Sequence, residues 1–205
     1  MWGVPPFPTL ERHARFLAMP LARNIELKAR LHDLASARET ARRLATDSLG
    51  VQQQIDTYFH CPQGRLKLRE TAFLDPAATN SPLATALVAS CRNELIWYNR
   101  PDDAQAKQSD YRLIEVSSDR ARQLKHEMGI RAIVIKRREV FLHRNVRIHL
   151  DEVYGLGEFI EFEAVLGWGI DETAGQAQVA YLEQQFGLAP ADLLCGSYAD
   201  LLLAR

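Results

Sequence analysis

The sequence predicts an α+β fold that is mainly β: a closed, antiparallel, eight-stranded β-barrel with flanking helices. About eight short segments alternate charged with apolar residues, as strands with one polar and one apolar face do. Turns containing Gly, Pro and Asp separate these segments, which favours antiparallel pairing. A few helical patterns between them can cover the apolar faces. The charged faces then point inward, around a cavity with room for one small ligand.

The strands are expected at residues 24–30, 52–59, 65–69, 94–100, 110–116, 131–142, 145–151 and 158–166. A helix is expected over 33–46, with Asp33 as its N-cap, and another over 118–128, with Gly129 as its C-cap. A polar loop covers 101–109. Residues 71–92 are expected to form an insertion that carries one short apolar helix around 83–90.

The length of 205 residues fits one domain. Residues 21–170 make the predicted barrel, and the Pro-rich residues 1–20 are expected to be a flexible extension. Residues 171–205 contain two predicted helices, over 173–186 and 191–203, which we expect to pack on the outside of the barrel. Taken singly, each strand also fits an open sheet whose polar face is solvated.

Composition excludes several classes of protein. The 25 Lys and Arg against 26 Asp and Glu give a net charge of −1, which argues against a nucleic-acid partner. Aromatic residues on the predicted strands could offer stacking surfaces for a single strand, an alternative that the near-neutral charge and the carboxylate pair described below oppose. They are Tyr58, Phe59, Trp97, Tyr98 and Tyr111. No apolar run approaches the roughly 18 residues that a membrane span needs. The three cysteines form no Cys-x-x-Cys pair, so we expect reduced thiols and a cytoplasmic protein. A homodimer is possible, but the sequence does not determine the oligomeric state.

Glu161 and Glu163 lie two residues apart in the last predicted strand and therefore share one face. Two carboxylates on one face repel each other unless a cation or basic side chains lie between them. Carboxylate oxygens are typical ligands of Mg²⁺ and Mn²⁺, so the pair predicts a site for one of these ions.

Charged residues from the other strands would meet this pair inside the barrel. The expected basic set is Lys28, Arg30, Lys67, Arg69, Arg100, Lys136, Arg138 and Arg147. The expected acidic set is Glu26, Asp56, Asp151, Glu161 and Glu163. Buried cations need partners, because desolvation costs several kcal/mol per ion. A polyphosphate bound together with divalent metal ions would satisfy both sets.

Five ordered pairs of these residues resemble the motifs of the CYTH superfamily, the triphosphate tunnel enzymes. The pairs are Glu26 with Lys28, Lys67 with Arg69, Lys136 with Arg138, Arg147 with Asp151, and Glu161 with Glu163. The resemblance covers residues 23–166. One departure is Asn24, where the family has its first Glu; a neutral side chain there weakens one metal position or leaves the metal to Glu26, Glu161 and Glu163.

The resemblance implies a function and a set of roles. It implies Mg²⁺ or Mn²⁺ held by Glu26, Glu161, Glu163 and Asp151, with Glu26, Lys28 and Asp151 in catalysis and the basic set on the substrate. Asp151 could instead cap the following turn, and Arg100 could lie on the surface. His149 is expected to be a hydrogen-bonding residue of the tunnel wall rather than a ligand, because its spacing from His143 matches no common metal motif.

The branch of the family that this chain resembles implies a class IV adenylyl cyclase, which converts ATP to cyclic AMP and pyrophosphate. Two alternatives stay open. One is a triphosphatase that hydrolyses inorganic, thiamine or nucleoside triphosphate. The other is a non-catalytic protein that binds a nucleotide or polyphosphate.

Overall fold

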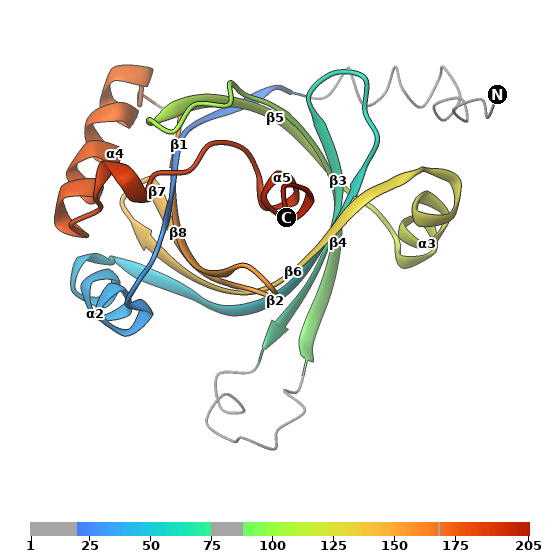
Figure 1. Ribbon diagram of the computed structural model, residues 1–205, viewed down its shortest axis with the longest axis horizontal. Coiled ribbons are helices and arrows are strands. Elements are labelled where there is room, and N and C mark those ends of the chain that lie inside the picture. The colour runs from blue at the N-terminus through green and yellow to red at the C-terminus, as the bar shows by residue number, and fades with distance from the viewer. Residues whose placement is uncertain (1–19, 75–87, 168) are drawn as a thin grey trace.

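A computed structural model describes residues 20–74, 88–167 and 169–205 (Figure 1). Eight antiparallel strands in that part of the chain form a closed barrel, in the order β1-β5-β4-β3-β2-β6-β7-β8, which confirms the predicted fold class. The strands are β1 (Ala22–Arg30), β2 (Asp47–Phe59), β3 (Arg65–Leu74), β4 (Val88–Asn99), β5 (Lys107–Glu115), β6 (Ile130–His143), β7 (Val146–Val153) and β8 (Gly157–Val165).

The helices lie between and after the strands. They are α2 (Leu34–Leu44), α3 (Ser118–Glu127), α4 (Glu172–Gln185) and α5 (Tyr198–Leu203), with a 3-10 turn at Pro190–Asp192. Asp33 caps α2 as predicted, since its side chain accepts a hydrogen bond from the Ser36 amide at 2.9 Å. No helix among the described residues is long and apolar enough to cross a membrane.

The strands place charged residues inside the barrel and apolar residues outside. On β1, Glu26 and Lys28 face the interior, whereas Ile25 and Leu27 belong to an apolar cluster that also contains Leu182 of α4. Figure 1 shows α2 and α4 on the β1, β7 and β8 side of the barrel. On this side of the barrel the charged faces point inward and the helices cover the apolar faces.

Helices cover only part of the outer surface. On the β3 side, α3 packs Leu124 against Leu68. On the β2–β6 side the outward residues Ile55, Ile133 and Ile135 are 37%, 50% and 41% exposed. On β2 and β6 the alternation of charged and apolar residues therefore marks which side chains face the charged interior, and the outward apolar side chains are left partly exposed.

Several predicted boundaries were wrong. β2 begins at Asp47, and β5 begins at Lys107, inside the loop predicted over 101–109. β4 begins at Val88, so the end of the helix expected around 83–90 is strand. Gly129 is not the C-cap of α3. The cap is Met128, whose amide bonds to the Leu124 carbonyl, and Gly129 does not adopt a positive φ. The expectations for residues 1–19 and 75–87 lie outside the described residues.

The largest error concerns the C-terminus. Residues 191–203 do not form one helix outside the barrel, because Gly196 adopts φ of 74° and a capping box of Ser197 and Asp200 starts the short helix α5. In Figure 1, α5 lies inside the ring of strands. Tyr198 is buried there, and its hydroxyl donates to Asp151 of β7 at 2.9 Å.

Candidate triphosphate and metal site

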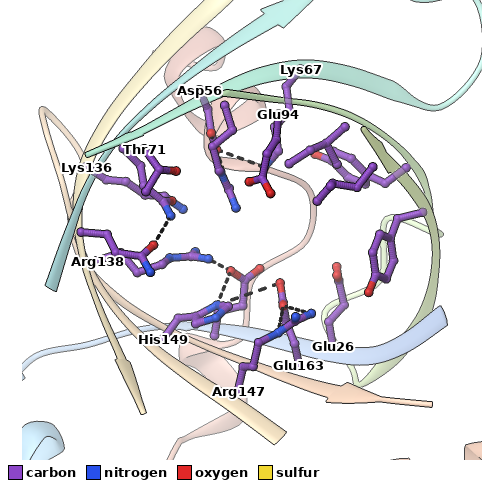
Figure 2. A pocket seen from close by; sticks show the side chains of 18 of the residues that line it. Glu26, Asp56, Lys67, Thr71, Glu94, Lys136, Arg138, Arg147, His149 and Glu163 are labelled. Atoms are coloured by element: carbon purple, nitrogen blue, oxygen red, sulfur yellow. Dashed lines mark hydrogen bonds and ion pairs between the residues drawn. The ribbon is translucent and has the colours of Figure 1, made fainter. Parts of the chain in front are cut away.

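All eight strands and the segment before α5 line a cavity of about 530 Å³ (Figure 2). Its charged and imidazole side chains come from all strands except β5, and Arg100 directly follows β4. They are Glu26, Lys28, Asp56, Lys67, Arg69, Arg92, Glu94, Arg100, Lys136, Arg138, Arg147, His149, Glu161 and Glu163. Cations and carboxylates that are distant in the sequence therefore share one interior.

The lining includes seven of the eight predicted substrate-binding cations, and Arg30 is the exception. Arg30 is the last residue of β1, at the rim of the barrel. Its guanidinium donates to the Leu156 carbonyl at 3.2 Å and lies over the Phe159 ring, 5.1 Å from the centroid. Arg30 anchors the β7–β8 turn and does not reach the cavity.

Asp56 fixes the two cations of β3. Arg69 donates to it through Nε and Nη2 at 2.7 and 2.8 Å, and Lys67 Nζ lies 3.0 Å away. Burial acts to raise the pKa of Asp56, but Arg69 and Lys67 outweigh it and hold the pKa well below its usual value. Burial and Arg69 lower the pKa of Lys67 to about 8.

Asp151 is not a cavity ligand, contrary to the expectation from the sequence. It is fully buried and does not line the cavity. Arg138 donates to both of its oxygens at 2.6 Å, and Lys136 and Tyr198 bond to Oδ2 at 3.3 and 2.9 Å. These groups surround the carboxylate, and Asp151 contacts two cations, Lys136 and Arg138, that line the cavity.

Glu161 and Glu163 both face the tunnel, as the strand period requires. Glu161 accepts from Lys28 at 2.6 Å and from Arg138 at 2.7 Å. Glu163 Oε2 accepts from Arg147 at 3.0 Å. Burial would raise the pKa of Glu163, but Arg147 and His149 outweigh it and lower the pKa to about 2, so both carboxylates are charged near neutral pH.

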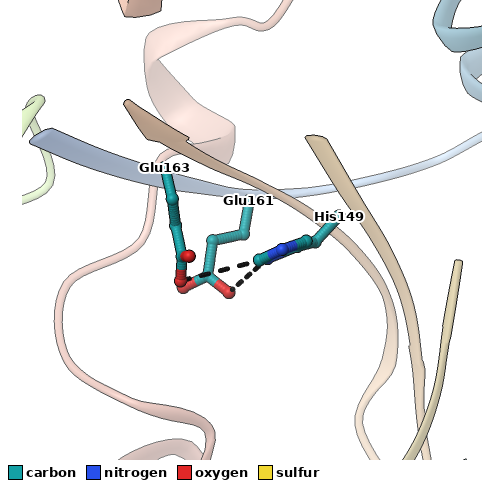
Figure 3. A group of neighbouring side chains, drawn as sticks. All are labelled: His149, Glu161 and Glu163. Atoms are coloured by element: carbon teal, nitrogen blue, oxygen red, sulfur yellow. Dashed lines mark ion pairs between the residues drawn. The ribbon is translucent and has the colours of Figure 1, made fainter. Parts of the chain in front are cut away.

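The imidazole of His149 lies beside the carboxylates of Glu161 and Glu163 (Figure 3). Its Nδ1 lies 3.5 Å from Glu161 Oε2 and 4.0 Å from Glu163 Oε1. The side chain is 5% exposed, and Nδ1 is a buried atom without a hydrogen-bond partner. Burial, helped by Arg138, lowers the pKa of His149 to about 4, so the imidazole is neutral at physiological pH. One donor atom from each of the three residues fits within 4.8 Å.

The other predicted metal ligand, Glu26, lies on β1, directly opposite Glu163 of the neighbouring strand β8. Glu26 lines the cavity and forms an ion pair with Arg100, whose Nη2 also donates to the Gly196 carbonyl at 2.6 Å. Arg100 is therefore a buried tunnel residue and not a surface arginine. Asn24 lines the cavity too, and its buried Oδ1 has no hydrogen-bond partner.

Some lining residues were not foreseen as site residues. Gln52 and Gln54 have the same phase on β2 as Asp56, and Glu94 has the same phase as Arg100, so the strand period could have identified them. No local pattern could have identified Tyr198. Its ring accepts Lys28 Nζ at 4.1 Å and Lys136 Nζ at 5.1 Å from the centroid, a contact that requires α5 inside the barrel.

The donor atoms fit a divalent metal ion together with a polyanion. The unpartnered Nδ1 of His149 beside two ionised carboxylates is a set of metal donors. Arg69, Arg138 and Arg147 point guanidinium groups into the same cavity, and guanidinium is the preferred partner of phosphate oxygens.

The comparisons agree with this geometry. The family model of the CYTH domain matches residues 22–167. PH1012 from Pyrococcus horikoshii OT3 superimposes with a TM-score of 0.66 at 20% identity, over 87% of this chain and 98% of its own. A putative adenylate cyclase from Vibrio parahaemolyticus gives 0.62 at 22% identity, over 88% and 97%.

A more distant structure has the same fold. A putative adenylyl cyclase from Hippeastrum, described as having a dominant triphosphatase activity, gives a TM-score of 0.54 at 13% identity, over 80% of this chain and 88% of its own. No curated protein sequence matches the chain significantly. At these identities the structural neighbours establish the barrel and leave the reaction open.

Proposed function

The chain belongs to the CYTH domain family, and we propose that it is a metal-dependent triphosphatase of the tunnel type. The observation that carries the proposal is the arrangement of the cavity. Guanidinium groups from β3, β6 and β7 face one interior that also contains the carboxylates of Glu161 and Glu163. A linear triphosphate is long enough, and charged enough, to contact several of these walls at once.

The cations bind and orient the phosphate chain. Arg69 and Arg138 are each held by a bidentate aspartate, so their forks are fixed before the anion arrives. Asp151 is a positioning residue in this proposal, because it acts through Arg138. Lys28 and Arg138 also contact Glu161, and we infer that a phosphate competes with Glu161 for them.

The metal would be held by Glu161 and Glu163. Bound there, a divalent ion supplies positive charge beside the phosphate oxygens. In hydrolysis, the oxygen of a water molecule would form a bond to the terminal phosphorus while the bond from that phosphorus to the bridging oxygen breaks. The bridging oxygen leaves with the pyrophosphate, and the proton that the water loses passes to a phosphate oxygen or to solvent. Arg138 and Arg147 stabilise the negative charge of the phosphate groups during this exchange.

Cyclisation of ATP is the second candidate, and one observation favours it. Near the start of β2 the cavity is lined by three apolar side chains, Leu49, Phe73 and Val140. The other end of β2 lies near α5, because Tyr58 belongs to the apolar cluster that contains Tyr198. This apolar rim at the end away from α5 could receive a nucleoside base while the phosphates occupy the charged interior. Hydrolysis is the better supported reaction because it requires no such pocket and needs only the charged lining.

The test is to incubate the protein with inorganic triphosphate, ATP or thiamine triphosphate, with Mg²⁺ or Mn²⁺, and to resolve the products. Release of orthophosphate supports the proposal, and formation of cyclic AMP with pyrophosphate would replace it by the cyclase. Tight binding without turnover would make the protein a binder.

A matched pair of variants on β8 connects the result to the site. Glu161→Gln should lower turnover at least a hundredfold. Glu158→Gln makes the same change three residues away, at a residue that does not line the cavity, and should leave the rate unchanged. Equal rates in the two variants would contradict the assignment of the site.

A further inference from the structure

We propose that His149 is itself a metal ligand, through Nδ1, and that this nitrogen makes the site of Glu161 and Glu163 select Mn²⁺ over Mg²⁺. The inference deepens the proposed function, since it concerns the identity of the ion that the triphosphate site uses. It reverses the expectation from the sequence that His149 only lines the wall.

The geometry of the three donors carries the inference. Ligands of an ion at about 2.1–2.2 Å are about 3 Å apart when they are at right angles and about 4.3 Å apart when they are opposite. Nδ1 of His149 lies 3.5 Å from one carboxylate oxygen of Glu161 and 4.0 Å from one of Glu163. Both distances fall in that range, and neither contact makes a hydrogen bond.

The isolation of Nδ1 is the second observation. A buried ring nitrogen without a partner costs free energy, because it has lost its hydrogen bond to water. His149 is 5% exposed and its ring is aimed at the two carboxylates (Figure 3). A divalent ion between the three side chains would accept the Nδ1 lone pair and remove this cost.

The two carboxylates each retain an oxygen turned toward the ring. Glu163 uses Oε2 for Arg147, at 2.9 and 3.0 Å, while its Oε1 is the oxygen nearest His149. Glu161 binds Lys28 through Oε1, and its Oε2 lies between Arg138 and His149. The donor set is therefore one nitrogen and two oxygens, all on the neighbouring strands β7 and β8.

This donor set discriminates between ions. Mg²⁺ favours oxygen ligands in a nearly ideal octahedron and gives up water reluctantly. Imidazole nitrogen binds first-row transition ions, and their affinity for such sites exceeds that of Mg²⁺. Mn²⁺ is the transition ion that also suits carboxylates, so a site with His149, Glu161 and Glu163 should bind it in preference to Mg²⁺.

The experiment uses the full chain with Mn²⁺ alone, without any triphosphate. Electron spin-echo envelope modulation of the bound Mn²⁺ should show coupling to one ¹⁴N nucleus, and labelling the histidines with ¹⁵N should change that coupling. Bound Mn²⁺ without nitrogen coupling would overturn the inference, and so would failure of Mn²⁺ to bind in stoichiometric amount.

Two histidine variants assign the nitrogen. His149→Gln should remove the coupling and weaken Mn²⁺ binding at least tenfold, with less than a threefold change for Mg²⁺. His143→Gln is the control, because His143 bonds to the Leu44 carbonyl and stacks on Tyr181 outside the cavity. Coupling that persists in His149→Gln, or is lost in His143→Gln, would contradict the inference.

The measurement separates this inference from the proposed function. Nitrogen coupling in a protein that turns over no triphosphate would support His149 as a ligand and refute the triphosphatase. Triphosphate hydrolysis in a protein whose Mn²⁺ shows no nitrogen coupling would support the triphosphatase and refute His149 as a ligand.

Discussion

Two neighbouring carboxylate centres of the barrel, both in contact with Arg138, have their hydrogen-bonding groups satisfied in different ways. The first, the Asp151 centre, is Asp151 with Lys136, Arg138 and Tyr198, and every contact of its carboxylate is a hydrogen bond to one of these groups. The second, the His149 cluster, is His149 with Glu161 and Glu163. It faces the cavity and contains a ring nitrogen without a partner.

The difference shows that acidic residues on neighbouring strands of one barrel can have different surroundings, enclosed by partners at Asp151 and open to the cavity at Glu163. Complete pairing and zero exposure make Asp151 part of the scaffold that holds Arg138 in place. Incomplete pairing next to open volume makes the His149 cluster able to take a ligand. Substitutions in the two centres should therefore affect different measurements.

The largest expected effect is on stability, from Asp151→Asn. The amide removes the charged partner of buried Lys136 and leaves Arg138 with Glu161 alone, which should lower the free energy of unfolding by about 3–5 kcal/mol. Urea denaturation measures it. Glu152→Gln is the control on the same strand, since Glu152 pairs with Arg137 at the surface and should lose less than about 1 kcal/mol. If both variants lost a similar free energy of unfolding, Asp151 would not be a special structural centre of the barrel.

Next comes the loss of metal binding in Glu163→Gln. The amide offers a weaker donor to a cation than the carboxylate does, so Mn²⁺ affinity should fall at least tenfold and turnover about a hundredfold. Calorimetric titration with Mn²⁺ and phosphate release measure the two effects. The comparison would fail if this variant lost stability as Asp151→Asn does while it still bound metal normally.

A smaller effect is expected from Tyr198→Phe. The variant keeps the ring that contacts Lys28 and loses the hydroxyl that donates to Asp151 at 2.9 Å. A hydrogen bond to a charged group contributes about 1.5–3 kcal/mol, so unfolding should become easier by about that amount. Mn²⁺ affinity, measured in the same preparations, should stay unchanged. If the variant is as stable as the parent, the Tyr198 hydroxyl does not stabilise the Asp151 centre.

The smallest expected effect is a pH dependence from Lys67. Burial and Arg69 lower the pKa of Lys67 to about 8, so at pH 9 its amine is mostly neutral in the free protein. A bound phosphate favours the charged form and raises this pKa, and binding of inorganic triphosphate at pH 9 should therefore take up protons. Affinity should fall about three- to tenfold as the pH rises from 7 to 9.

Calorimetry in two buffers of different ionisation enthalpy measures this uptake. Lys67→Arg is the matched variant, because guanidinium keeps its charge at pH 9 and should decrease the uptake. Equal proton uptake in both proteins would show that Lys67 does not meet the anion.

The alternation along the strands was sufficient to predict much of the site. The alternation assigned each of these residues to the charged face of its strand: Lys67, Lys136, Arg138 and Glu163. When the sheet closes into a barrel, the charged faces meet in one interior. The alternation failed for Arg30, which has the right phase but lies at the end of β1, beyond the cavity. Phase determines the face of a strand, and the stagger of the barrel determines the height along its axis.

The sequence by itself determined that charged and apolar residues lie on opposite strand faces, because the strand period of two is a local property of the backbone. The tertiary structure alone decided that Asp151 is enclosed, that His149 Nδ1 is left without a partner beside Glu161, and that Tyr198 enters the barrel. Pairing and burial depend on side chains from β6, β7, β8 and α5 meeting in three dimensions. No spacing within one segment encodes which of them meet.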